Sequence, residues 1–284
     1  MTKENQQLSS PNSAYQINVL NKFNDRIEEI ELFFALIAKF EAVNPAQLIS
    51  VDDNIHLIAA NDLDIQDDDV EVTIKHILNK LRIETPDGDL LNIFKSNAVL
   101  LLYNLVESTV SNTDSFILKT ITDAQMLYSQ ANPVIKSFWI EHCSKFDKKE
   151  HLSVAISLLD NVQTIKIDIK KQQNDNEKEF QGNLNPLEID NLLRKYGIEP
   201  TKDKMLRKET ERTAVKNIAQ WRNDLAHGKY SFAEFGRNTL RYEPLSSLHK
   251  KEENIVFLKY ACFLFLEIFL ENVEDYTEYQ RYKV

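Results

Sequence analysis

The chain has 284 residues, enough for one large core or two modest ones, and its 43% apolar and 27% charged residues are ordinary for a soluble globular protein. Its five glycines and seven prolines are few, which favours long helices over a sheet joined by many tight turns. The net charge of −10 argues against a broad, non-specific nucleic-acid-binding surface, and two cysteines far apart argue against a disulfide framework.

The N-terminal residues are polar and lack the apolar region of a signal peptide, so we expect a disordered tail over residues 1–14. An amphipathic helix is predicted from Tyr15 to Val43, where Asn44-Pro45 ends it. No apolar run reaches the length of a membrane span, which indicates a cytoplasmic protein without membrane contact. The side chains expected to face the core are Ile17, Leu20, Phe23, Ile27, Ile30, Phe34 and Ile37.

An acidic segment follows, because residues 50–72 include eight Asp and Glu and neither Lys nor Arg. Such a cluster fits either a docking site for a basic partner or a metal site. We favour a solvated insertion over about residues 50–89, since no loop has the glycine-centred ligand spacing of a calcium site. Alternating apolar residues at 70–74 also fit a short strand ahead of the turn signal at 86–88.

The most apolar stretch runs from Leu90 to Val110 and predicts a central helix that is buried nearly all round. Asn97, Asn104 and Glu107 interrupt this apolar background and share one face. Buried polar groups need partners, and we expect these on the helix that carries the motif described below. Both a structural hydrogen-bonding role and a supporting role at an active site fit this placement.

Capping signals and apolar periodicity predict four more helices before the motif and one after it. The segment 170–178 is polar and is predicted to be a loop, and 229–245 is expected to be irregular. The last helix is unusually aromatic, which predicts exposed apolar surface for a partner chain. The helices are expected from Asp114 to Ala131, from Pro133 to Phe146, from Lys149 to Val162, from Pro186 (capped by Asn185) to Gly197, and from Glu252 to Tyr276.

A helix from Glu209 to His227 carries apolar residues on one side and polar residues on the other. Gly228 directly after it predicts the helix end, so His227 lies in the final turn. Arg222 is separated from His227 by about 140° of helical rotation. The apolar side comprises Ala214, Ile218, Trp221 and Leu225, and the polar side Lys216, Gln220, Asn223 and His227.

Arg222 and His227, with four residues between them and Asn223 directly after the arginine, resemble the signature of HEPN domains, helical modules many of which are metal-independent ribonucleases. Four stretches resemble, in this order, a bacterial HEPN-like nuclease family of similar size. The resemblance implies an all-α fold: an HEPN-like helical bundle with additional helices and the acidic insertion, forming a single domain over residues 15–284. The four stretches are Phe23 to Phe40, Phe94 to Val110, Phe180 to Ile198 and Arg222 to Arg237.

The chemistry expected of this motif is attack of a ribose 2′-hydroxyl on the adjacent phosphate of RNA. His227 would move the proton, Arg222 would supply fixed positive charge, and Asn223 would orient His227 or bind phosphate. Asp224, Asn104 and Glu107 are expected to support them. The histidines have no metal-ligand spacing and the glycines form no phosphate-binding loop, so we assign neither a metal nor a cofactor.

Positive charge is concentrated around the motif. Between Arg194 and Arg241 there are twelve Lys and Arg against six Asp and Glu, a local charge of +6 that leaves −16 elsewhere. Basic residues here would guide a short phosphate backbone to one site, although a solvated helix face explains many such runs. The expected RNA contacts are Lys216, Lys229, Arg237 and Arg241.

Arg222 and His227 diverge on one helix, so we expect two subunits to face their motif helices across a two-fold axis and form one composite cleft. The resemblance implies the same homodimer, together with a toxin or antiviral-defence role and a cognate antitoxin or defence partner. Two alternatives remain at this point: a non-catalytic HEPN-type module that binds nucleotide or protein, and a helical assembly protein whose motif helix is only a dimer interface.

Overall fold

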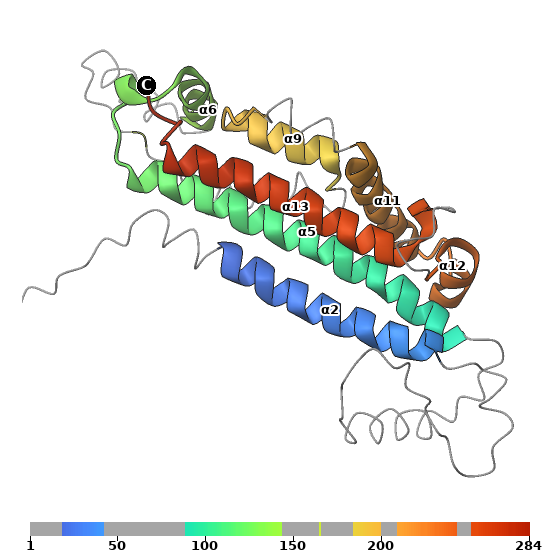
Figure 1. The fold of residues 1–284 in the computed structure, drawn as a ribbon. Helices are drawn as coiled ribbons and strands as arrows, with labels where there is room; N and C mark the ends of the chain where they lie inside the picture. Colours follow the sequence, from blue (N-terminus) through green and yellow to red (C-terminus); the bar gives the residue numbers. More distant parts are fainter. Residues whose placement is uncertain (1–18, 43–88, 144–164, 166–183, 200–208, 243–250) are drawn as a thin grey trace, which may run out of the picture.

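The computed structural model describes residues 19–42, 89–143, 165, 184–199, 209–242 and 251–284, and these form helices without a strand (Figure 1). This confirms the predicted all-α fold. The predicted tail, nearly all of the acidic insertion, the helix at 149–162 and the loop at 170–178 lie outside the described residues. Within the described part, the helices are α2 (Asn21–Ala42), α5 (Asp89–Asp123), α6 (Pro133–Cys143), α9 (Pro186–Lys195), α11 (Glu209–Ala226), α12 (Phe232–Thr239) and α13 (Ile255–Glu278), with 3-10 helices η3 (Tyr128–Gln130) and η4 (Lys251–Glu253).

The central helix α5 is one continuous helix of 35 residues, about 52 Å long. The expectation of a break near Val110 and a new helix capped by Asp114 is therefore wrong. Asp114 lies buried inside α5, where its carboxylate accepts a 2.5 Å hydrogen bond from the hydroxyl of Tyr196. A distant side chain thus satisfies the carboxylate that we expected to cap a helix, and the apolar pattern continues through Phe116 and Ile117.

Helices α2 and α13 lie along α5 on different sides (Figure 1). Of the seven α2 side chains predicted to face the core, Phe23, Ile30, Phe34 and Ile37 are buried, while Leu20 and Ile27 are half-buried against it. The seventh lies outside the described residues. The predicted amphipathic helix is therefore confirmed over 21–42, and none of the described helices combines the length and apolar character of a membrane span.

Helix α13 packs against both α5 and α11. It begins at Ile255, capped by the side chain of Asn254, and residues 251–253 form the separate 3-10 helix η4. Its aromatic side chains serve mainly the chain's own core, because Phe263, Phe265 and Phe269 are buried. The exposed apolar surface predicted for this helix is limited, within α13, to Tyr260 at 47% and Leu264 at 43%, which lie four residues apart.

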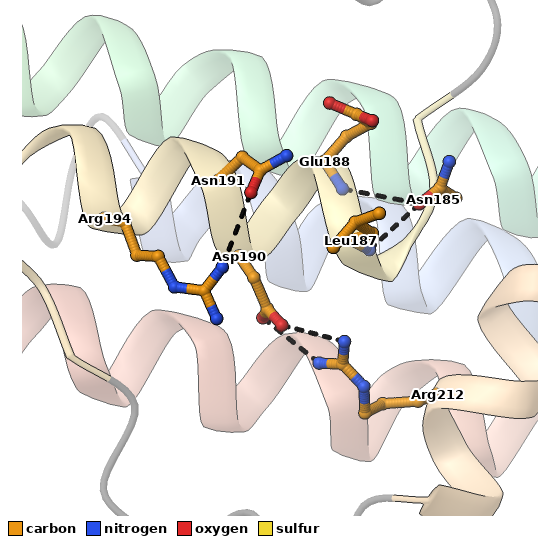
Figure 2. Close-up of polar contacts among 7 residues, drawn as sticks. All are labelled: Asn185, Leu187, Glu188, Asp190, Asn191, Arg194 and Arg212. Carbon is orange, nitrogen blue, oxygen red and sulfur yellow. Dashed lines mark hydrogen bonds and ion pairs between the residues drawn. The ribbon is translucent and has the colours of Figure 1, made fainter.

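Helix α9 is confirmed in detail. The Asn185 side chain caps it by accepting hydrogen bonds from the backbone N–H groups of Leu187 and Glu188, as Figure 2 shows. Pro186 occupies the first turn, where its missing N–H costs nothing. Gly197 follows the helix with a φ of +76°, the left-handed conformation that suits glycine.

Helix α12 corrects the expectation that residues 229–245 are irregular. Ser231 caps it by accepting a hydrogen bond from the backbone of Glu234, and Phe235 is buried. Gly236 lets α12 approach α5 closely, since a Cβ built there would lie well under 3.0 Å from the backbone oxygen of Asn92. The short length and the internal glycine concealed this helix in the sequence, because both weaken its local signal.

Candidate active site

Helix α11 carries the motif, and Arg222 occupies a half-buried position on it. Its guanidinium carbon lies 4.9 Å from the ring centroid of Tyr103 on α5. Its Nη1 donates a 3.1 Å hydrogen bond to Oδ1 of Asn223. A ring face and an amide oxygen therefore constrain the guanidinium, which retains further N–H donors for a ligand.

Tyr103 is fully buried, and its hydroxyl oxygen accepts a 3.2 Å hydrogen bond from the backbone N–H of Leu184. Burial raises the pKa of the Tyr103 phenol; the Leu184 hydrogen bond opposes this, the negative charge of Glu107 adds to it, and the positive charge of Arg222 opposes it. The hydroxyl consequently stays protonated at neutral pH. Tyr103 thus joins α5, the start of α9 and the motif arginine at one point.

His227 lies exposed directly beyond the last residue of α11. Its backbone N–H donates a 2.9 Å hydrogen bond to the carbonyl of Asn223, so it still belongs to the final helical turn, as predicted. Gly228 then adopts a φ of +67° and ends the helix, which confirms that prediction. The imidazole is open to a ligand from solvent, whereas the arginine is fixed from within the fold.

Asn223 and His227 were expected to project together. The Asn223 amide oxygen accepts a hydrogen bond from Arg222 Nη1, and the Asn223 backbone carbonyl accepts one from the His227 backbone N–H. Asp224 supports the end of the helix, because its carboxylate accepts hydrogen bonds from Gln220 Nε2 at 3.1 Å and from Lys229 Nζ at 3.3 Å. Asp224 was expected to support the motif residues, and its carboxylate binds Gln220 and Lys229 at the end of the helix.

The expected RNA contacts are largely paired with carboxylates. Lys229 pairs with Asp224, Arg237 on α12 pairs with Asp89 at the start of α5, and Arg241 pairs with Glu253 at 3.1 Å. Lys216 is exposed on α11. Each paired cation is more than 40% exposed, and such surface pairs contribute only about 0–1 kcal/mol, so a phosphate can replace the carboxylate.

Another basic residue of the same stretch has a structural partner. Arg212 on α11 forms a bidentate pair with Asp190 on α9, with N–O distances of 3.1 and 2.8 Å (Figure 2). The same figure shows Arg194 turned toward Asn191 on its own helix, at 3.5 Å. Arg212 therefore links two helices. The positive charge available to a ligand near the motif is smaller than the local charge of +6 counted from the sequence.

The polar residues of the central helix differ in their burial and in their partners. Asn104 is exposed, and Asn97 donates a 2.9 Å hydrogen bond to the carbonyl of Ile93 one turn earlier, so the expectation that both are buried and need partners on α11 is wrong. Glu107 is half-buried, and its charge acts on Tyr103. The sequence did not single out Tyr103, because a tyrosine in an apolar helix is indistinguishable from an ordinary core residue.

A family model described as MAE_28990-like HEPN matches residues 16–282, nearly the whole chain. No curated protein and no solved structure matches the chain significantly.

Proposed function

Because the chain belongs to the MAE_28990-like HEPN family, we propose that it is a metal-independent endoribonuclease. Family membership supports an RNA-related or nuclease-like function. The observation that carries the finer proposal is the arrangement of Arg222 and His227: a guanidinium constrained by Tyr103 and Asn223, with an exposed imidazole at the end of the same helix.

The proposed reaction is an internal transfer on the RNA backbone. A 2′-hydroxyl loses its proton to the imidazole of His227 and forms a bond to the adjacent phosphorus, and the bond from phosphorus to the 5′-oxygen breaks. The leaving oxygen takes up a proton, so the products are a cyclic phosphate and a 5′-hydroxyl. Arg222 stabilises the negative charge that develops on the phosphate, and the hydrogen bond that it donates to Asn223 Oδ1 keeps the guanidinium in place.

We place the reaction at a composite site between two copies of the chain. Arg222 and His227 diverge by about 140° around one helix, so two antiparallel motif helices would complete what one copy lacks. Burial supports this orientation, because Leu225 is buried and Trp221 packs against the core of its own chain. Asn223 and His227 would then lie nearest the two-fold axis.

Lys216, Lys229, Arg237 and Arg241 are proposed to guide the RNA backbone to this site. We further propose that the protein acts in the cytoplasm as a toxin or antiviral-defence effector, controlled by a cognate antitoxin or defence partner.

The decisive experiment incubates the purified protein with single-stranded RNA in excess chelator and identifies the product ends. We expect cleavage that leaves cyclic phosphate and 5′-hydroxyl ends, and a loss of about 100-fold or more in Arg222→Ala and in His227→Ala. Arg26→Ala is the matched control, because Arg26 is an exposed arginine on α2. Strict dependence on a divalent ion would exclude the proposed mechanism.

Expression in a bacterial host provides a second readout. We expect growth arrest that His227→Ala relieves while the fold stays intact, because His227 is exposed and adds little to the core. Unchanged toxicity in that folded variant would remove His227 from the mechanism.

A further inference from the structure

An exposed aromatic ring follows the motif, directly beyond the end of the motif helix. Tyr230 comes three residues after His227, directly beyond the turn at Gly228, and is 36% exposed. Three steps of the chain span at most about 11 Å, so the Tyr230 backbone stays within one or two nucleotide lengths of His227.

Aromatic packing holds this ring from behind. The centroid of Tyr230 lies 6.1 Å from that of Phe235, which is buried on α12, and their planes are tilted by 38°. Phe235 in turn contacts Trp221 edge-on at 5.7 Å, on the motif helix itself. The three rings connect the motif helix to the surface, so Tyr230 presents a supported ring rather than a free side chain.

Positive charge accompanies the ring. Lys229 Nζ lies over the Tyr230 ring, 5.3 Å from its centroid and 3.3 Å from Asp224 Oδ2, so it has to move with the phosphate when a base stacks on that face. The hydrogen bond and charge of Asp224 raise the pKa of the Lys229 ammonium, which therefore remains a cation. Because Lys229 is exposed, it can exchange this carboxylate for a phosphate at little cost.

We propose that Tyr230 stacks one unpaired nucleobase of the RNA beside the scissile phosphate, while Lys229 takes the phosphate of that nucleotide. The proposal rests on the proposed function in placing RNA at His227. An aromatic ring next to a cation is the arrangement by which proteins bind single strands, because every base has a π-face and every nucleotide a phosphate. Bases inside a duplex have no free face, so the substrate is single-stranded.

The test measures binding without cleavage. The probe is a fluorescein-labelled RNA strand with 2′-O-methyl riboses, which lack the attacking hydroxyl, used alone and annealed to its complement. Tyr230→Ala should weaken binding of the single strand about 5- to 150-fold, and Tyr230→Phe, which keeps the ring, less than about threefold. Binding of the duplex should not change. Tyr279→Ala is the control, since Tyr279 is 67% exposed at the far end of α13.

Several outcomes would overturn the stacking site. One is that the unaltered protein does not bind the single strand. Another is that Tyr230→Ala and Tyr279→Ala lose equal affinity for it, and a third is that Tyr230→Ala loses equal affinity for the single strand and for the duplex. If Tyr230→Ala does not fold, Tyr230→Trp decides, because a stacked base should quench its fluorescence and an unstacked one should not. RNA that binds through Tyr230 but is never cleaved would reject the nuclease and retain the stacking site.

Discussion

Arg222 is positioned before any ligand arrives. The Tyr103 ring and the Asn223 amide constrain its guanidinium, and Tyr103 is itself fixed by burial and by the Leu184 backbone. Charge that is already oriented does not have to be reorganised during a reaction, which is why fixed donors contribute so much to catalysis. A lysine at this position would carry the same charge without the planar fork or the stacking face.

Arg222→Lys should therefore reduce the cleavage rate about 100-fold or more while changing the free energy of unfolding by less than about 2 kcal/mol. Cleavage in chelator and thermal unfolding of the same preparation measure both quantities. Arg26→Lys on α2 provides the matched control and should have no effect on either. Near-normal cleavage by Arg222→Lys would show that only the charge of Arg222 matters.

At the scale of elements, the contact between α12 and α5 depends on a single missing side chain. Gly236 faces the Asn92 backbone oxygen without room for a Cβ, and Ser96 Oγ donates a 2.6 Å hydrogen bond to the Phe232 carbonyl beside it. The position of α12 also determines where Phe235, and with it Tyr230, lies relative to α11.

Gly236→Ala should destabilise the protein by about 1–3 kcal/mol or more, because backbone must move to admit the methyl group. Urea unfolding measures the loss. Gly228→Ala is the comparison: a Cβ there meets nothing within 4 Å, so its cost comes from the φ of +67° alone, about 1 kcal/mol. A larger loss in Gly228→Ala than in Gly236→Ala would contradict this account of the contact.

Elements with local signals were predictable from the sequence. The start of α9 follows from Asn185-Pro186, and the end of α11 from Gly228, because caps act within a few residues. Asp114 was wrongly predicted to cap a helix, because the hydroxyl that binds its carboxylate belongs to Tyr196, 82 residues away in the sequence. The same holds at the site, where the spacing of the motif was visible but its contact with Tyr103 depends on how α5 and α11 pack.

At the scale of the whole molecule, several weakly acidic groups are buried in their protonated form. Burial raises the pKa of the Cys262 thiol to about 12, and burial likewise raises the pKa of Tyr276. The pKa of Tyr196 is raised by burial first and by the neighbouring Asp114 carboxylate second. Because these groups stay protonated in the folded chain, the free energy of unfolding should decrease at alkaline pH.

Stability should accordingly fall as pH rises above about 9 for the thiol and above about 10 for the tyrosines, by roughly 1.4 kcal/mol per pH unit for each such group. In that range the unfolded chain has released protons that the folded chain retains, since the ordinary pKa values are 9.0 for the thiol and 10.0 for tyrosine. Urea unfolding at about pH 8 and about pH 11 measures the slope. Cys262→Ala should reduce the slope by the share of one group, and a constant stability across this range would contradict the assignment.

The composite site predicts complementation between chains. An Arg222→Ala chain mixed with a His227→Ala chain should recover part of the activity that each lacks alone, because heterodimers can assemble an intact set of groups. Unfolding and refolding the two together, followed by a cleavage assay, tests this. A species that scatters light as a monomer at the working concentration and still cleaves RNA would reject the composite site but leave the nuclease proposal standing.

The packing of α5 against α13 also has a consequence during synthesis on the ribosome. α5 ends at Asp123 and α13 begins at Ile255, so at about 5–20 residues per second roughly 7–26 s pass between the emergence of the two. The motif helix is made within this interval, before the helix that covers part of its buried face exists. We therefore expect the proposed nuclease activity to be absent from the nascent chain until α13 leaves the ribosome, which would spare the surrounding RNA during synthesis.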